Sequence, residues 1–365
     1  MNGSGIRLGV AAMAIVLGGS FAGSAAAGDG DPAAEKLLEA GHWKRLRGIA
    51  EPRVAANPND AQAAFLLSRV KEAFGDLRGA LALAEKAVWL DPNNARHHFQ
   101  VARLCGDLAQ KAGIFKGMGF AHRIKKEIDI AISLDPKFMD ARELLMQFYF
   151  NAPGIAGGDK KKAYATVEAI GRLDAYRGLV AQALLADEEK NPAKMEEFYL
   201  KAAAAAPRDY LVLSRLAGFY ASNGQKKYDL AEKYGLEALK IEEGRVGPYV
   251  VLAGAYAATE RWKELDAAIA RAEKNVPDDY GPHYQAGRML LLSGKDLPRA
   301  ERYFRKYLTM EPEGGEPKHA AAHWRLGQVL EKQGKKQEAI AEMEEALRLQ
   351  PDFKQAKEDL KRLKK

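Results

Sequence analysis

The first candidate for chemistry is the stretch NAPGIAGGDKKKA at residues 151–163, which combines three glycines with three lysines. A phosphate-binding loop requires a glycine, four residues, then Gly-Lys and Ser or Thr, directly after a strand. Neither Gly154 nor Gly157 has this spacing, and no Ser or Thr follows the lysines. The stretch therefore argues against a nucleotide site and indicates a connecting loop.

Histidine and cysteine side chains are the next candidates, because they could bind a metal. His98 and Cys105 lie seven residues apart on one helical face, but both fall at core positions of the repeat described below, and free cysteine is commonly buried. His319 and His323 have the four-residue spacing of a zinc pair, without an evident third ligand nearby. We expect no metal site, and the single cysteine allows no internal disulfide.

Signatures of catalysis are missing from the sequence. It has no Ser-His-Asp order, no nucleophile elbow and no HExxH motif. The adjacent carboxylates Glu242-Glu243 and Glu344-Glu345 would point apart on a helix, as solvated residues do. We expect no enzyme activity, no catalytic residue and no cofactor.

The elements that must position any site are helices. Alanine is unusually frequent beside Leu, Glu and Lys, and these residues lose little side-chain freedom in a helix. Strict alternation of Val, Ile and Thr, the usual strand signal, is missing. We expect an all-α protein. Its net charge of +7 is weak support for anionic partners, because acidic residues are interspersed with the basic ones.

Residues 1–27 have the layout of a secretory signal peptide. Arg7 is followed by an apolar run, Leu8–Leu17, and then by the small residues Ala25-Ala26-Ala27. We expect cleavage after Ala27 and a free periplasmic protein, with an uncleaved membrane anchor as the alternative. No cysteine follows the apolar run, so we expect no lipoprotein, and export argues against a nucleic-acid partner.

A repeat of about thirty-four residues runs through the chain. Residues 61–94 and 320–353 superimpose, each with an apolar first helix, a glycine turn, a second helix and a closing Leu-x-Pro. The matched positions are Leu67 with Leu326, Gly75 with Gly334, Ala80 with Ala339, Ala87 with Ala346, and Pro92 with Pro351. One hairpin cannot bury its apolar face alone, but stacked hairpins share a continuous core.

This pattern resembles the tetratricopeptide repeat, and residues 176–209, 210–245, 246–279 and 280–319 keep much of it. The resemblance implies a right-handed α-solenoid of about eight helix-turn-helix units, with a degenerate N-terminal unit and a C-terminal capping helix. We assign residues 28–60 to the degenerate unit and residues 61–365 to the solenoid.

Two neighbouring units carry insertions between their helices. Thirteen residues lie between Cys105 and Gly119, where the first unit has three at the same place. In the next unit the inserted residues are Pro153, Gly154, Ile155, Ala156 and Gly157. Insertions tend to fall on one face, so we expect them to mark one edge of the solenoid, and the second to serve partner contact or local groove shape. The pairing is similar to that in exported bacterial tetratricopeptide proteins with an APG-x-x-GG-type loop.

In the family the first helices line a concave groove, where an extended peptide or a partner helix binds. The family's inward positions fall in three groups of this sequence. They are Phe65, Arg69, Arg96, Phe99 and Arg103 in the N-terminal part; Leu211, Val250, Val251, Gly254 and Ala257 in the middle; and Tyr284, Arg288, Trp324 and Arg325 in the C-terminal part. We expect the N-terminal group to bind an anionic segment or headgroup and the middle to receive the ligand's apolar part.

Two functions of different classes fit this pattern. The first is a periplasmic scaffold or adaptor that binds a protein or peptide partner in its groove, in envelope assembly or secretion. The second is a carrier of a lipid or other hydrophobic small molecule in the apolar middle of the groove. Crosslinking in intact cells and organic extraction of the purified protein distinguish them.

Overall fold

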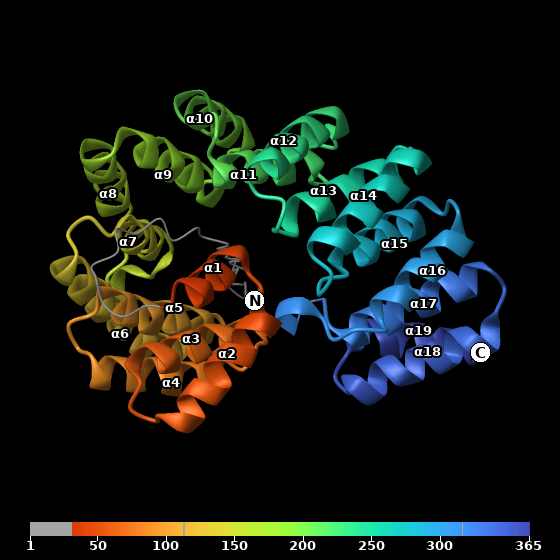
Figure 1. The fold of residues 1–365 in the computed structure, drawn as a ribbon, viewed down its shortest axis with the longest axis horizontal. Coiled ribbons are helices and arrows are strands. Elements are labelled where there is room, and N and C mark those ends of the chain that lie inside the picture. Colours follow the sequence, from red (N-terminus) through yellow and green to blue (C-terminus); the bar gives the residue numbers. More distant parts are fainter. Residues whose placement is uncertain (1–30, 112–113, 316) are drawn as a thin grey trace, which may run out of the picture. The chain divides into compact units, whose positions relative to one another are not determined.

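The computed structural model describes residues 31–111, 114–315 and 317–365. These residues form nineteen α-helices and two short 3₁₀ helices, and no strand occurs among them (Figure 1). The predicted all-α class is therefore confirmed. The predicted signal peptide lies outside the described residues, and the predicted boundaries at residues 27 and 60 stay predictions. None of the helices in the described ranges combines the length and apolarity needed to cross a membrane.

The helices follow one another as hairpins, from α1 with α2 to α17 with α18, and α19 comes last. Their bounds are α1 (Pro32–Ala40), α2 (Trp43–Ala56), α3 (Ala61–Ala73), α4 (Leu77–Leu90), α5 (Ala95–Lys111), α6 (Ile114–Leu134), α7 (Met139–Asn151), η1 (Gly154–Ala156), α8 (Lys160–Leu173), α9 (Ala175–Glu188), α10 (Pro192–Ala205), α11 (Tyr210–Ala221), α12 (Tyr228–Ile241), α13 (Gly247–Ala258), α14 (Trp262–Asn275), α15 (Gly281–Ser293), α16 (Leu297–Tyr307), η2 (Glu313–Gly315), α17 (His319–Lys332), α18 (Lys336–Leu349) and α19 (Lys354–Leu363). The eight predicted units correspond to the hairpins from α3 to α18.

The turns of the repeat have a local physical cause. Gly75 lies between α3 and α4 with a φ of +82°, a conformation that costs glycine little and other residues more. Asp76 then caps α4, because its carboxylate accepts a hydrogen bond of 2.9 Å from the amide of Gly79. The predicted small positions Ala80 and Ala87 are fully buried, so the two helices of a hairpin can approach closely.

The chain divides into two compact units. Unit 1 consists of residues 47–72 and 76–181 with the segment before residue 36, and unit 2 consists of residues 36–46, 73–75 and 182–365. Residues 36–46 contact the rest of unit 2 through Lys44, whose backbone amide donates a hydrogen bond of 2.8 Å to the carboxylate of Glu313. Unit 1 has a core of residues from α4 to α7 and η1, and unit 2 has one from α12 to α19.

The larger insertion lengthens helices instead of forming a wide turn. Helix α5 has 17 residues and α6 has 21, compared with 13 in α3 and 14 in α4. The smaller insertion contains η1, which packs against α6. Ala156 of η1 is buried in the unit 1 core, beside residues of α5, α6 and α7. The smaller insertion thus contacts a helix that the larger one lengthens, a relation that follows from the stacking of neighbouring hairpins.

Candidate functional site

Every residue predicted for the groove lies on the first helix of a hairpin: α3, α5, α11, α13, α15 or α17. We call the surface that these helices form within a unit the first-helix face of that unit. The side chains on it differ in burial and in their partners, and these differences decide which of them can contact a ligand.

The first-helix face of unit 1 contains a closed ion cluster. Arg69 is buried and donates to the carboxylate of Glu72 at 2.8 Å and to the amide oxygen of Gln100 at 3.1 Å. Arg103 donates to the other oxygen of Glu72 at 2.9 Å. Glu72 also accepts a hydrogen bond of 2.8 Å from Gln100. Two of the three predicted arginines therefore already have an anionic partner within the chain.

Burial and charge change the acidity of this cluster. Burial alone would raise the pKa of Glu72, but the charges of Arg103 and Arg69 outweigh it and hold that pKa below its usual value. Asp107, on the same helix as Arg103, behaves in the opposite way. Burial, and next the charge of Glu72, raises the pKa of Asp107 to about 6.

The third predicted arginine of this group is also paired. Arg96 donates to both carboxylate oxygens of Glu35, at 3.1 and 2.8 Å, and its guanidinium lies 4.9 Å from the centre of the Phe65 ring. Such a bidentate pair is one of the stronger side-chain contacts. Arg96 is thus held by α1 and α3.

The prediction that Phe65 and Phe99 offer aromatic surface to a ligand is wrong, because both rings are buried. Phe65 is only 1% exposed and Phe99 only 4%, so neither presents aromatic area to a ligand. Phe99 packs edge-on against Phe138, with ring centres 4.9 Å apart, inside the core of unit 1. The family's inward positions do not carry over here, because the rings fill space between hairpins. Binding of a partner by the N-terminal arginines stays a prediction.

The predicted middle group is mostly covered. Leu211, Val250 and Val251 are half-buried, whereas Gly254 and Ala257 are buried. A side chain at Gly254 would meet the amide nitrogen of Gln285 at 2.8 Å, so α15 packs closely over this position. Little apolar surface is left for a ligand at Gly254 and Ala257.

The predicted C-terminal group, Tyr284, Arg288, Trp324 and Arg325, is half-buried throughout. Tyr284 is half-buried, with its ring centre 5.5 Å from that of Phe304. Arg288 donates to the amide oxygen of Gln285 at 3.0 Å. The indole of Trp324 donates to Asp359 at 2.8 Å, and the guanidinium of Arg325 lies 4.2 Å from the centre of the Trp324 ring.

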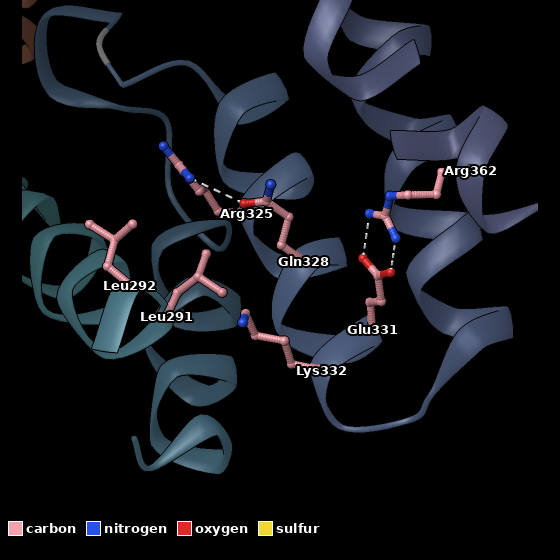
Figure 2. A pocket seen from close by; sticks show the side chains of 7 residues that line it. All are labelled: Leu291, Leu292, Arg325, Gln328, Glu331, Lys332 and Arg362. Carbon is pink, nitrogen blue, oxygen red and sulfur yellow. Dashed lines mark hydrogen bonds and ion pairs between the residues drawn. The ribbon is translucent and has the colours of Figure 1, made fainter. Parts of the chain in front are cut away.

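A cavity of about 560 Å³ opens on the first-helix face of unit 2 (Figure 2). Its lining residues come from α15, α17 and α19 and are Leu291, Leu292, Arg325, Gln328, Glu331, Lys332 and Arg362. Leu291 is buried, but Leu292 is 58% exposed. Only Arg325 of this set was predicted. Three consecutive leucines, 290 to 292, were a usable signal, because a helix cannot turn all three toward one core.

One wall of the cavity is fixed by an ion pair. Arg362 donates to both carboxylate oxygens of Glu331, one of them at 2.8 Å, as the dashed lines in Figure 2 mark. Asp359 accepts from Trp324, Gln328 and Arg362. Burial would raise the pKa of Asp359, but these hydrogen bonds outweigh it and lower that pKa. The carboxylate of Asp359 therefore stays ionised beside Arg362.

The opposite wall of the cavity contains the cationic side chains of Arg325 and Lys332, without a carboxylate partner among the described residues. Arg325 donates to the amide oxygen of Gln328 at 3.1 Å, and its buried Nε has no hydrogen-bond partner within the described residues. In the part of the chain that the structure describes, no Asp or Glu pairs with Arg325 or Lys332. This side of the cavity can accept an anion next to the apolar surface of Leu292.

The three histidines considered as metal ligands, His98, His319 and His323, each contact an oxygen atom of the protein. His98 is buried between the carboxylate of Glu127, at 2.6 Å, and the carbonyl oxygen of Pro92, at 2.9 Å. The ring of His319 contacts the carbonyl oxygen of Met310, and that of His323 contacts Glu342. Burial raises the pKa of the Cys105 thiol to about 11. Over the described ranges, no three His, Cys, Asp or Glu side chains gather as metal ligands would.

The chain is similar to solved structures of low sequence identity and matches one protein family over part of its length. No curated protein matches the chain. The crystal structure of yeast Tom70 has 14% identity, covers 91% of this chain and 80% of its own, and has a TM-score of 0.46. Pseudomonas aeruginosa PilF has 17% identity, covers 60% of this chain and 95% of its own, and has a TM-score of 0.42.

The Cut9–Hcn1 hetero-tetramer of APC/C has 12% identity, covers 90% of this chain and 88% of its own, and has a TM-score of 0.40. The family match covers a shorter stretch, from α15 to α18, and includes the cavity residues of α15 and α17. Residues 284–352 of this chain match the tetratricopeptide repeat family.

Proposed function

We propose that this chain is a non-catalytic scaffold, exported to the periplasm, that binds a protein partner on the first-helix face of unit 2, in envelope assembly or secretion. The observation that carries the proposal is the cavity between α15, α17 and α19, where an exposed leucine lies beside cations without carboxylate partners among the described residues. The tetratricopeptide repeat match over residues 284–352 supports it, since such repeats commonly bind proteins.

The chemistry of the cavity favours an extended acidic segment with an apolar side chain. Exposed apolar surface beside polar groups is typical of interaction sites, and Leu292 supplies it. Arg325 is held against Trp324, so its guanidinium loses little freedom when it binds a carboxylate. Lys332 adds a second positive charge at the same opening.

The carrier of a hydrophobic small molecule stays a prediction. The cavity includes none of the residues 211–257 that were predicted to hold such a ligand. Gly254 and Ala257 of that group are buried by neighbouring helices. The protein-binding function is therefore the better supported of the two.

Crosslinking at Leu292 tests the proposal directly. A photoreactive amino acid at Leu292, activated in intact cells, should give a discrete adduct with one protein. The Arg325→Glu and Lys332→Glu double variant should lose most of that adduct, because both changes repel an acidic segment. Leu349 is the matched control, since it is an exposed leucine of the same unit on the second helix α18.

The crosslinking experiment has distinct results for a protein-binding cavity and for a lipid carrier. The same adduct from Leu349, or an adduct that the double variant leaves unchanged, contradicts binding at the cavity. A lipid adduct at Leu292 supports the carrier instead. The probe labels whatever lies within reach of one side chain, so the partner need not be identified before the experiment.

A further inference from the structure

The loop between α7 and α8 holds one apolar side chain away from the protein. Ile155 is 77% exposed, although the neighbouring Ala156 is buried in the core of unit 1. Pro153 and Gly154 are exposed as well. Exposure of an isoleucine at the tip of a loop has no role in the packing of the hairpins.

This loop is fixed by backbone hydrogen bonds and by glycine. The carbonyl oxygen of Pro153 accepts from the amides of Ala156 and Gly158, at 2.8 and 3.0 Å, and the amide of Asp159 donates to Tyr149 at 2.8 Å. Gly157 has a φ of +96°, and a side chain at Gly158 would lie 1.7 Å from the carbonyl oxygen of Ala152. The sequence therefore holds Ile155 in one position, which limits the entropy that its binding would cost.

Lysines follow the apolar tip directly. Lys160, Lys161 and Lys162 are all exposed, and among the described residues none of them has a carboxylate partner. Asp159 is engaged as the cap of α8, where it accepts from the amides of Lys161 and Lys162. The positive charge at this edge is therefore available to an anionic surface.

Aromatic rings lie under two of these lysines. The ammonium of Lys160 lies 4.6 Å from the ring centre of Phe150, and that of Lys162 lies 5.7 Å from the ring centre of Tyr149. Both rings are half-buried. Apolar tips, aromatic rings and lysines with long stems are typical of protein surfaces that contact lipid at a membrane interface.

We propose that residues 153–162, which we call the insertion platform, dock unit 1 on an anionic lipid surface. Ile155 enters the boundary between headgroups and acyl chains, and the three lysines contact lipid phosphates. A lipid surface fits better than a protein pocket, because lysine is a point charge on a flexible stem that does not require a fixed partner geometry. This inference does not rest on the function proposed for unit 2.

Vesicle co-sedimentation tests the platform. The chain is used as recovered from cells, with residues 1–30 in the same state in every variant, so that binding by the apolar run Leu8–Leu17 is common to all. The probes are phosphatidylcholine vesicles with and without about one third phosphatidylglycerol. We expect stronger binding to the anionic vesicles, and Ile155→Asp should weaken that binding about tenfold because a charge replaces the apolar tip.

Two further variants separate the contributions. Replacing Lys160, Lys161 and Lys162 by Ala should weaken the binding about tenfold at low salt and much less at high salt, since screening acts on charge. Trp89→Ala is the matched control, because Trp89 is 76% exposed in the same unit but lies on α4. That change should leave the binding unaltered.

Ile155→Trp gives a second readout that does not depend on affinity, because tryptophan emission at this position should shift to the blue on anionic vesicles. Equal binding to both vesicle types, or an equal loss from Trp89→Ala and Ile155→Asp, overturns the proposal. A protein adduct from a photoreactive residue at position 155, without vesicle binding, also overturns it and assigns the platform to a protein partner.

Discussion

On the first-helix face of unit 1, Arg69 and Arg103 share the carboxylate of Glu72. On that of unit 2, Arg325 lies against the Trp324 ring and donates to an amide oxygen, that of Gln328. The aromatic residue nearby differs as well. Phe99 beside Arg103 is buried in the core, but Trp324 beside Arg325 keeps its polar edge on Asp359. The same residue types on equivalent helices therefore serve structure in one unit and leave binding capacity in the other.

An arginine on a first-helix face therefore indicates a binding site only if no carboxylate of the chain already pairs with it. A buried arginine needs a matched carboxylate, and the pair then contributes little net stability although breaking it is costly. An arginine that lacks a carboxylate keeps its capacity for an external one. Four changes, ordered by expected effect, test this distinction.

The largest effect should come from the core aromatic ring. Phe99→Ala should lower the free energy of unfolding by about 3–5 kcal/mol, because it leaves a cavity in the core of unit 1. Leu292→Ala in unit 2 should change it by less than about 1 kcal/mol, because most of that side chain is already exposed. Urea denaturation of both variants measures the contrast. A small effect of Phe99→Ala contradicts its place in the core.

Loss of the shared carboxylate should come second. Glu72→Gln removes the carboxylate that the buried Arg69 and the half-buried Arg103 share, and should destabilise the protein by about 3 kcal/mol. Glu331→Gln is the matched change in unit 2, where Arg362 is largely exposed, and it should cost no more than about 1 kcal/mol. If both variants lose the same free energy of unfolding in thermal or urea denaturation, burial does not distinguish the two ion pairs.

Removal of the charge at Asp107 should stabilise unit 1 in a pH-dependent way. The pKa of Asp107 is raised to about 6 in the folded chain, above about 4 in an unfolded one, so the folded state holds this proton more tightly. Stability is therefore lost as the pH rises from about 4 to about 6. Asp107→Asn should be more stable than the natural chain by about 2 kcal/mol at pH 7 and equally stable below pH 4. Urea unfolding of both proteins across this pH range measures the difference in stability. If Asp107→Asn is still the more stable protein at pH 4, the charge of Asp107 is not the reason for its higher stability.

The smallest effect concerns binding. Arg325→Ala and Lys332→Ala should each weaken the binding of an acidic, leucine-containing peptide by about 1 kcal/mol without changing stability. The losses should shrink as salt is raised, since both act through charge. Fluorescence anisotropy with the acidic peptide and a basic one of the same length measures the change. Lys335→Ala is the control, because Lys335 is exposed and already pairs with Glu301 in the same unit.

The sequence was sufficient for the fold because the repeat is local. Glycine at the turn, alanine at the close contacts and proline after the second helix act within one hairpin, as Gly75, Ala80 and Pro92 do. The number of hairpins followed from counting these positions. The length of α5 and α6 did not, because residues inserted between helices can extend them as well as separate them.

The site was predicted less well because it depends on side chains that are distant in sequence. Glu35 reaches Arg96 across sixty-one positions, and no spacing within one repeat could show that this arginine is already paired. Arg362 of the cavity likewise comes from the last helix, outside the repeat pattern. The exposure of Leu292 could have been predicted from the sequence, since α15 carries three leucines in a row and a helix cannot bury all of them on one side.

The contact between η1 and α6 has a consequence for engineering of the array. A hairpin of a regular repeat protein can be duplicated, deleted or exchanged alone, because each unit offers its neighbours the same surface. Here Ala156 of one hairpin fills space against the lengthened helix of the one before it. A graft of α7 and α8 into a regular array would leave that alanine without its neighbour. The hairpins α5–α6 and α7–α8 would therefore have to be transplanted together.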